Sequence, residues 1–174
     1  EGPFERLGGS KRGMKFITKI PPLVAVPTTA GTGSEVSPGA VVILDNGMKE
    51  TFVSAHLVPI AAVCDPELTL GLPASLTAAT GMDAMTHCIE AVLTPVVHPP
   101  AEAIGVDGAE RIGKWLEIAV KDGANRDARW HMMMGSFEGA LAFAKGLGAV
   151  HGLSHALGRI HELKLHHGTL NAVI

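Results

Sequence analysis

The 174-residue sequence is poor in cysteine and in charged residues, and it has no excess of basic side chains. Its two cysteines, Cys64 and Cys88, form no CxxC pair, so they indicate buried free thiols in a reducing compartment and not a disulfide framework. The 14 Lys and Arg against 17 Asp and Glu give a net charge of -3, which offers no basic field to a phosphate backbone. We therefore expect a cytoplasmic protein without a nucleic-acid partner.

Apolar runs long enough to span a membrane are also missing. The longest run, 57–64, is interrupted by Pro59 and predicts a buried strand with its lead-in, not a membrane helix. Hydrophobic residues nevertheless make up 47% of the chain and charged ones only 18%, which excludes disorder as the main state. This excess of apolar residues predicts that part of the surface is covered, so we expect a homo-oligomer, most simply a dimer, or a piece of a larger chain.

The pattern of apolar residues changes near Pro73. Before it, short apolar runs alternate with turns and predict strands over 23–26, 40–44 and 60–64, with a turn at 45–47. After it, apolar residues recur at spacings of three and four and predict helices over 75–93, 103–120, 128–145 and 151–158. The predicted fold class is therefore α/β followed by all-α, with an α/β part over residues 1–72 and a helical part over residues 73–174.

Two potential metal ligands lie on the first predicted helix. Asp83 and His87 are four residues apart, so on a helix their side chains point to the same side and could chelate one ion. The alternative is a structural pair, an acidic residue near a helix start and a hydrogen-bonded core histidine.

A second group of histidines lies near the end of the chain. Five of the nine histidines fall between His151 and His167, and His151 and His155 are again one helical turn apart. Three imidazoles and one carboxylate from two segments would suit Zn²⁺, Fe²⁺ or a similar divalent ion. Spacing alone leaves open both the metal and which of these histidines bind it.

The loop after the first predicted strand is rich in glycine and hydroxyl residues. Over 27–36 it reads Pro-Thr-Thr-Ala-Gly-Thr-Gly-Ser-Glu-Val, so backbone N–H groups and hydroxyls could approach a phosphate or a ribose. It lacks the third glycine of a Rossmann fingerprint, so an ordinary turn is the alternative.

Together these segments resemble the iron-containing (group III) alcohol dehydrogenase family. The resemblance rests on four segments in order: 27–36, the Asp-Pro-Glu-Leu-Thr of 65–69 followed by Pro73, the Gly-Met-Asp-Ala-Met-Thr-His of 81–87, and 148–155. It extends from about Pro21 to the last residue. It implies the end of an N-terminal dinucleotide-binding α/β domain followed by the start of a helical metal-binding domain. It also implies a metal-dependent, NAD(P)-linked enzyme that interconverts an alcohol and an aldehyde or ketone.

The resemblance also implies roles for individual residues. The metal ligands would be Asp83, His87, His151 and His167, holding Fe²⁺ or alternatively Zn²⁺. His155 would stand near the nicotinamide and the substrate and relay the proton. The cofactor, NAD or NADP, would be contacted by Thr28, Thr29, Thr32 and Lys49. The remaining histidines are expected to be ordinary surface or core residues: His56, His98, His131 and His161.

The chain departs from the family pattern in two ways. The interval from His151 to His167 is longer than the common family spacing, so the turn between them should bulge, and His166 competes for the fourth ligand position. The upstream glycine-rich loop that holds the pyrophosphate in the family is missing, and the chain has about half the family's usual length. Two alternatives follow: an inert fragment that retains metal binding, and a metal-independent relative similar to the maleylacetate reductases.

Overall fold

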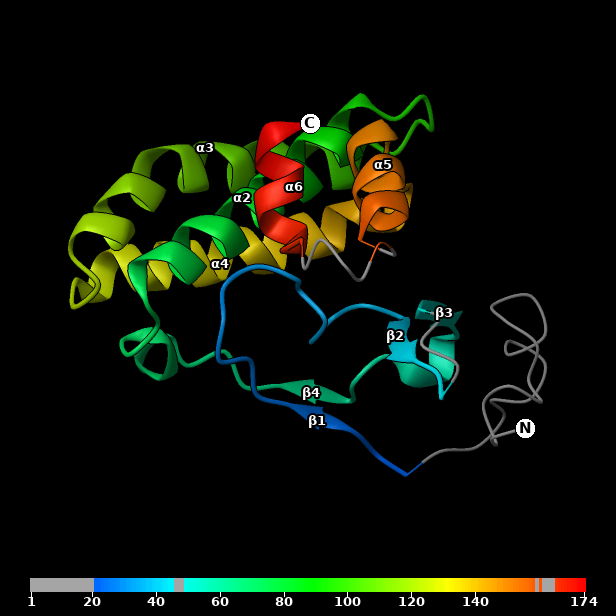
Figure 1. Ribbon diagram of the computed structural model, residues 1–174, viewed down its shortest axis with the longest axis horizontal. Coiled ribbons are helices and arrows are strands. Elements are labelled where there is room, and N and C mark those ends of the chain that lie inside the picture. Colours follow the sequence, from blue (N-terminus) through cyan, green and yellow to red (C-terminus); the bar gives the residue numbers. More distant parts are fainter. Residues whose placement is uncertain (1–20, 46–48, 159, 161–164) are drawn as a thin grey trace.

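Strands and loops occupy one half of the molecule and helices the other (Figure 1). The structure is a computed structural model, and it describes residues 21–45, 49–158, 160 and 165–174. Strands precede Pro73 and long helices follow it, which confirms the expected fold class. The division into two domains at residue 73 stays a prediction.

Two small sheets form the first half. β1 (Val24–Ala25) pairs in parallel with β4 (Ala61–Ala62), and β2 (Gly39–Ile43) pairs antiparallel with β3 (Lys49–Val53). The short helix η2 (Ala55–Leu57) lies between β3 and β4. The predicted strands 23–26 and 60–64 contain β1 and β4, and the predicted strand 40–44 overlaps β2. The sequence reasoning missed β3, which opens with two charged residues.

The expectation that the third predicted strand is buried is wrong. Ala61, Ala62 and Val63 are exposed, so the described residues leave this strand largely uncovered. The predicted turn at 45–47 lies partly outside the described residues. Cys88 is fully buried, as expected, but Cys64 is only half-buried.

Three long helices form the core of the second half: α2 (Ala74–Leu93), α3 (Pro99–Lys121) and α4 (Arg126–Ala142). Their shared interior contains Ala84, Cys88, Ala119 and Ala128 beside the larger Ile112 and Met132, so mostly small side chains allow the helices to pack closely. α2 agrees with its predicted range to within one residue, whereas α3 and α4 both begin earlier than predicted. α3 already begins at Pro99, because the first helical turn tolerates proline. His98 is its N-cap residue, and the Nδ1 atom of His98 accepts a hydrogen bond from the Ala101 N–H.

Shorter elements complete the chain: η3 (Pro66–Thr69) precedes α2, η4 (Phe143–Lys145) follows α4, and α5 (Ala149–Leu157) and α6 (His167–Val173) come last. α4 ends before η4, so the predicted helix over 128–145 is split. α6 lies along α2, beside α5 (Figure 1). Among the described residues, no helix combines the length and apolar character needed to cross a membrane.

Large apolar side chains remain on the surface. Val97 and Val173 are 83% and 80% exposed, and Leu93 and Ile60 are 75% and 72% exposed. These side chains agree with the expectation that part of this surface is covered, which stays a prediction. The dimer stays a prediction.

Candidate metal centre

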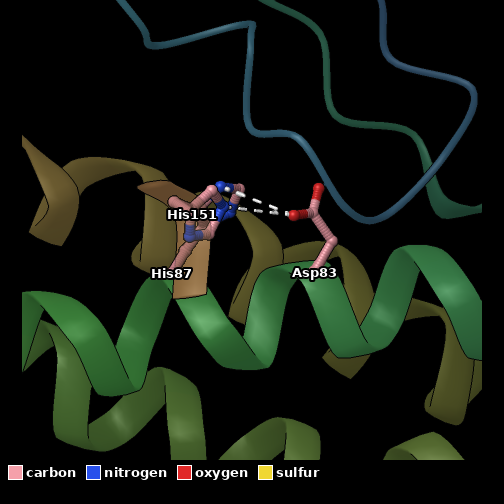
Figure 2. A group of neighbouring side chains, drawn as sticks. All are labelled: Asp83, His87 and His151. Atoms are coloured by element: carbon pink, nitrogen blue, oxygen red, sulfur yellow. Dashed lines mark ion pairs between the residues drawn. The ribbon is translucent and has the colours of Figure 1, made fainter. Parts of the chain in front are cut away.

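Three helices bring one carboxylate and three imidazoles together. Asp83 and His87 project from the same side of α2, and His151 from α5 meets them, as Figure 2 shows. One potential ligand atom from each of these three buried residues lies within 4.8 Å of the others. His167, at the start of α6, joins them through its contact with Asp83.

The Oδ1 atom of Asp83 is the common point of this cluster. The Nε2 atoms of His151 and His167 each lie 3.4 Å from it, and Nε2 of His87 lies 3.7 Å from it. Ligand atoms about 2.1 Å from a tetrahedral ion are about 3.4 Å apart, so the observed separations fit a four-coordinate divalent ion. The donor set, three imidazoles and one carboxylate, suits Fe²⁺ and Zn²⁺ alike.

The sequence of α6 explains how His167 reaches the cluster. Gly168 follows it and faces α2, where a Cβ atom would collide with the backbone of Ala79. Any larger residue would therefore push α6 away from α2. His166 is exposed and occupies the N-cap position of α6. Of the two candidates for the fourth position, the structure places His167 beside Asp83.

The pKa values of the two α2 residues favour the protonation states that bind metal. Burial lowers the pKa of His87 to about 4, although the neighbouring Asp83 acts in the opposite direction, so the imidazole is neutral near pH 7. Burial would raise the pKa of Asp83, but the contact with His151 and the charges of the nearby histidines lower it overall. Asp83 is thus a carboxylate, and His87 keeps a lone pair for an ion.

The predicted cofactor loop lies against this cluster. Gly31 packs on α2, where a Cβ atom would come within 2.7 Å of Thr80 Cβ, and its backbone lies beside the His87 ring. Thr28 and Thr32 are exposed and Thr29 is half-buried, so these hydroxyl residues are accessible near the metal ligands. Thr32 accepts a hydrogen bond from the Ser34 N–H, which fixes the turn.

Lys49, the fourth predicted cofactor contact, is the first residue of β3. Its side chain lies outside the described part of the chain, so its position relative to the loop stays a prediction.

His155 lies at the edge of the cluster, on the surface. It is exposed, one turn after His151 on α5, and its ring centroid lies 6.1 Å from that of His151 and 4.9 Å from that of His167. The other histidines lie elsewhere. His56 is exposed, His98 caps α3, and His131 stacks on Trp115. His161 is outside the described residues.

Sequence reasoning missed two residues of this centre, Glu90 and Asn171. Glu90 lies on the same side of α2 as Asp83 and His87, and it contacts Nδ1 of His151 at 2.6 Å. Asn171 is one turn after His167, and its Nδ2 donates to Asp83 Oδ1 at 2.7 Å. The Oδ1 atom of Asn171 is buried and lacks a hydrogen-bond partner among the described residues. Helical spacing from the predicted ligands was the available signal for both.

Family models cover most of the chain. The model described as "Fe-containing alcohol dehydrogenase family, C-terminal" matches residues 77–174, and "Iron-containing alcohol dehydrogenase" matches residues 4–66. The chain therefore belongs to the iron-containing alcohol dehydrogenase family.

Known members resemble the chain closely. A curated relative, 4-hydroxybutyrate dehydrogenase of Cupriavidus necator, is 59% identical over 170 residues, which cover 96% of this chain and 44% of that protein. The solved alcohol dehydrogenase from Oenococcus oeni has a TM-score of 0.88 at 34% identity, covering 97% of this chain and 43% of that one. Sulfoacetaldehyde reductase from Bifidobacterium kashiwanohense was solved in complex with NAD+. It has a TM-score of 0.84 at 36% identity, and the match covers 88% of this chain and 41% of that one. The chain thus spans less than half the length of these relatives.

Proposed function

We propose that this chain forms the metal-binding part of an NAD(P)-dependent alcohol dehydrogenase. The observation that carries the proposal is the convergence of three histidine Nε2 atoms on Asp83 Oδ1 at 3.4–3.7 Å. A metal held by Asp83, His87, His151 and His167 would be Fe²⁺, or alternatively Zn²⁺. Family membership and a relative solved with NAD+ support the nicotinamide cofactor.

The reaction would be RCH₂OH + NAD(P)⁺ → RCHO + NAD(P)H + H⁺, or its reverse. When bound, the ion would supply Lewis acidity that lowers the pKa of the alcohol hydroxyl, and the nicotinamide would accept the hydride. Thr28, Thr29 and Thr32, in the loop packed against α2, would contact the cofactor beside the metal ligands, as would Lys49. The substrate would be a small alcohol, and the 4-hydroxybutyrate named for one relative is a suitable first candidate.

His155 would carry the released proton outward. It is exposed, and its ring lies next to those of His151 and His167, so it lies between the buried ligands and solvent. An imidazole can change charge near neutral pH, which suits it to this transfer. The inferred setting is a cytoplasmic homodimer, in agreement with the free thiols and the exposed apolar side chains.

A matched pair of variants tests the proposal. Elemental analysis of protein purified without chelator should find about one Fe or Zn per chain. His167→Ala should lose this metal, whereas His166→Ala, which changes the exposed neighbour, should retain it. An absence of metal in the folded parent, or equal metal loss in both variants, would contradict the proposed ligand set.

Activity distinguishes the two alternative functions. The metal-loaded chain is mixed with a short primary alcohol or 4-hydroxybutyrate and NAD or NADP, and NAD(P)H formation is followed by absorbance. Activity that chelator abolishes supports the proposal. Bound metal without activity would favour the inert fragment, and chelator-resistant activity would favour the metal-independent relative.

A further inference from the structure

Glu90 lies behind His151, on the side opposite the potential metal position. It is buried on α2, and its Oε2 lies 2.6 Å from Nδ1 of His151, while Nε2 of the same ring faces Asp83 Oδ1 at 3.4 Å. The two nitrogens of this imidazole therefore face two carboxylates. Glu90 and His151 are 61 residues apart in the sequence, so this contact joins α2 to α5.

The same carboxylate caps the start of α5. Gly148, the N-cap residue, has no side chain to accept the first N–H groups of the helix. Glu90 accepts them instead, from Val150 through Oε1 at 2.7 Å and from His151 through Oε2 at 3.4 Å. An anion at this position also interacts favourably with the helix dipole.

Gly148 allows this approach. A Cβ atom there would lie 2.7 Å from Glu90 Oε1, so a larger residue would displace the carboxylate. Glu90 is thus an acceptor held at a fixed place relative to His151.

An acceptor at Nδ1 determines which nitrogen of His151 can bind an ion. When Nδ1–H donates to Glu90, the lone pair of the neutral ring is on Nε2, which faces Asp83. Carboxylates in this position fix the orientation of metal-binding histidines and make them more basic, and their loss commonly weakens metal binding about 10–100-fold.

We propose that Glu90 is a positioning residue for the metal centre. Its carboxylate holds the first turn of α5 against α2 and fixes the His151 ring so that Nε2 faces the ion. This inference rests on the proposed metal site and adds to it a residue that binds no metal itself.

The test compares Glu90→Gln with Glu138→Gln. The first substitution keeps the size of the side chain and one carbonyl oxygen but removes the charge. Glu138 is half-buried on α4, paired with Arg111 at 3.2 Å, and serves as the control. Competition with a chromophoric chelator should show Zn²⁺ binding about 10–100-fold weaker in Glu90→Gln and within about twofold of the parent in Glu138→Gln. The visible absorption spectrum of the Co²⁺-loaded protein should change only in Glu90→Gln.

Unchanged Zn²⁺ affinity and Co²⁺ spectrum in a folded Glu90→Gln variant would overturn the inference. A parent that binds no metal would instead refute the proposed function, and the inference would fail with it. Nitrogen-15 NMR of the parent at alkaline pH gives a measurement that needs no variant. The proton of neutral His151 should be on Nδ1, and a proton on Nε2 would overturn the role of Glu90 even if the variant fails to fold.

Discussion

The Arg129 guanidinium joins the first turn of α4 to the first turn of α2, where its Nη1 donates to Thr77 Oγ1 at 2.8 Å. Its Nη2 also donates to the Leu72 carbonyl at 3.2 Å, and its Nε donates to the Gly123 carbonyl at 2.9 Å. Arg129 is only 2% exposed. It therefore fixes the start of the helix that carries two of the proposed metal ligands.

Replacement of Arg129 should destabilise the fold. Arg129→Ala would leave buried acceptors without a donor, so we expect a loss of about 3 kcal/mol in the free energy of unfolding. Arg126→Ala is the control, because Arg126 is exposed and its ion pair with Glu67 is an exposed one, worth no more than about 1 kcal/mol. Urea unfolding of both variants checks this. Similar midpoints for the two would show that the buried hydrogen bonds contribute little.

Gly33 should not tolerate a side chain. Its φ of +58° lies in the left-handed region, and a Cβ atom would collide with the Cβ of Ala140 on α4. Gly33→Ala should therefore lower the free energy of unfolding by about 2–4 kcal/mol, through backbone strain and overpacking together. Gly71→Ala is the control, since a Cβ atom there meets nothing within 4 Å. Urea midpoints give the comparison, and an unshifted Gly33→Ala midpoint would mean that the loop can move off α4 at little cost.

The metal-free protein should lose stability in mild acid because of His87. Its pKa falls from 6.5 to about 4 on folding, so between these values the unfolded chain binds a proton that the folded chain does not. Stability from this group is therefore complete above about pH 6.5 and lost as the pH falls toward 4. The pKa of His151 is raised on folding, so its own contribution to the pH dependence lies mainly above pH 6.5.

Urea unfolding of chelator-treated protein at several pH values measures this effect. His87→Gln should show a smaller loss of stability between pH 6.5 and 4 than the parent, because the titrating group is gone. Equal slopes for parent and variant would show that His87 is not the group responsible.

His155 should affect turnover without affecting metal content. It is exposed and lies beside the proposed ligands, so His155→Ala should lower kcat by about 100-fold or more through the lost proton transfer. Asp83→Ala should instead abolish metal binding. Elemental analysis and steady-state kinetics on both variants check this division. Equal metal loss would place His155 among the ligands.

The sequence predicts the helical half better than the strands. Periodicity over many residues places α2 within one residue of its observed start, because a long amphipathic pattern averages out local exceptions. β3 was missed because its first residues, Lys49 and Glu50, are charged, and its own composition does not show that it pairs with β2. The burial of a strand such as β4 depends on which layers cover it, which a local pattern does not contain.

The sequence also predicts some residues of the candidate centre and misses others. Helical spacing alone pairs Asp83 with His87, but joining them to His151 and His167 required the family resemblance, since no local rule brings α5 and α6 onto α2. Glu90 was not predicted because a lone glutamate on a helix usually faces solvent. Its function depends on a contact 61 residues away in the sequence.

That separation also sets the order in which the centre is made. At about 5–20 residues per second, the ribosome adds the 61 residues between Glu90 and His151 in about 3–12 s. During this interval only two of the four proposed ligands, Asp83 and His87, have been synthesised, a pair too small to hold an ion tightly. Metal would then be acquired after α5 and α6 have been synthesised, so the choice between iron and zinc would depend on the ions available to the finished fold.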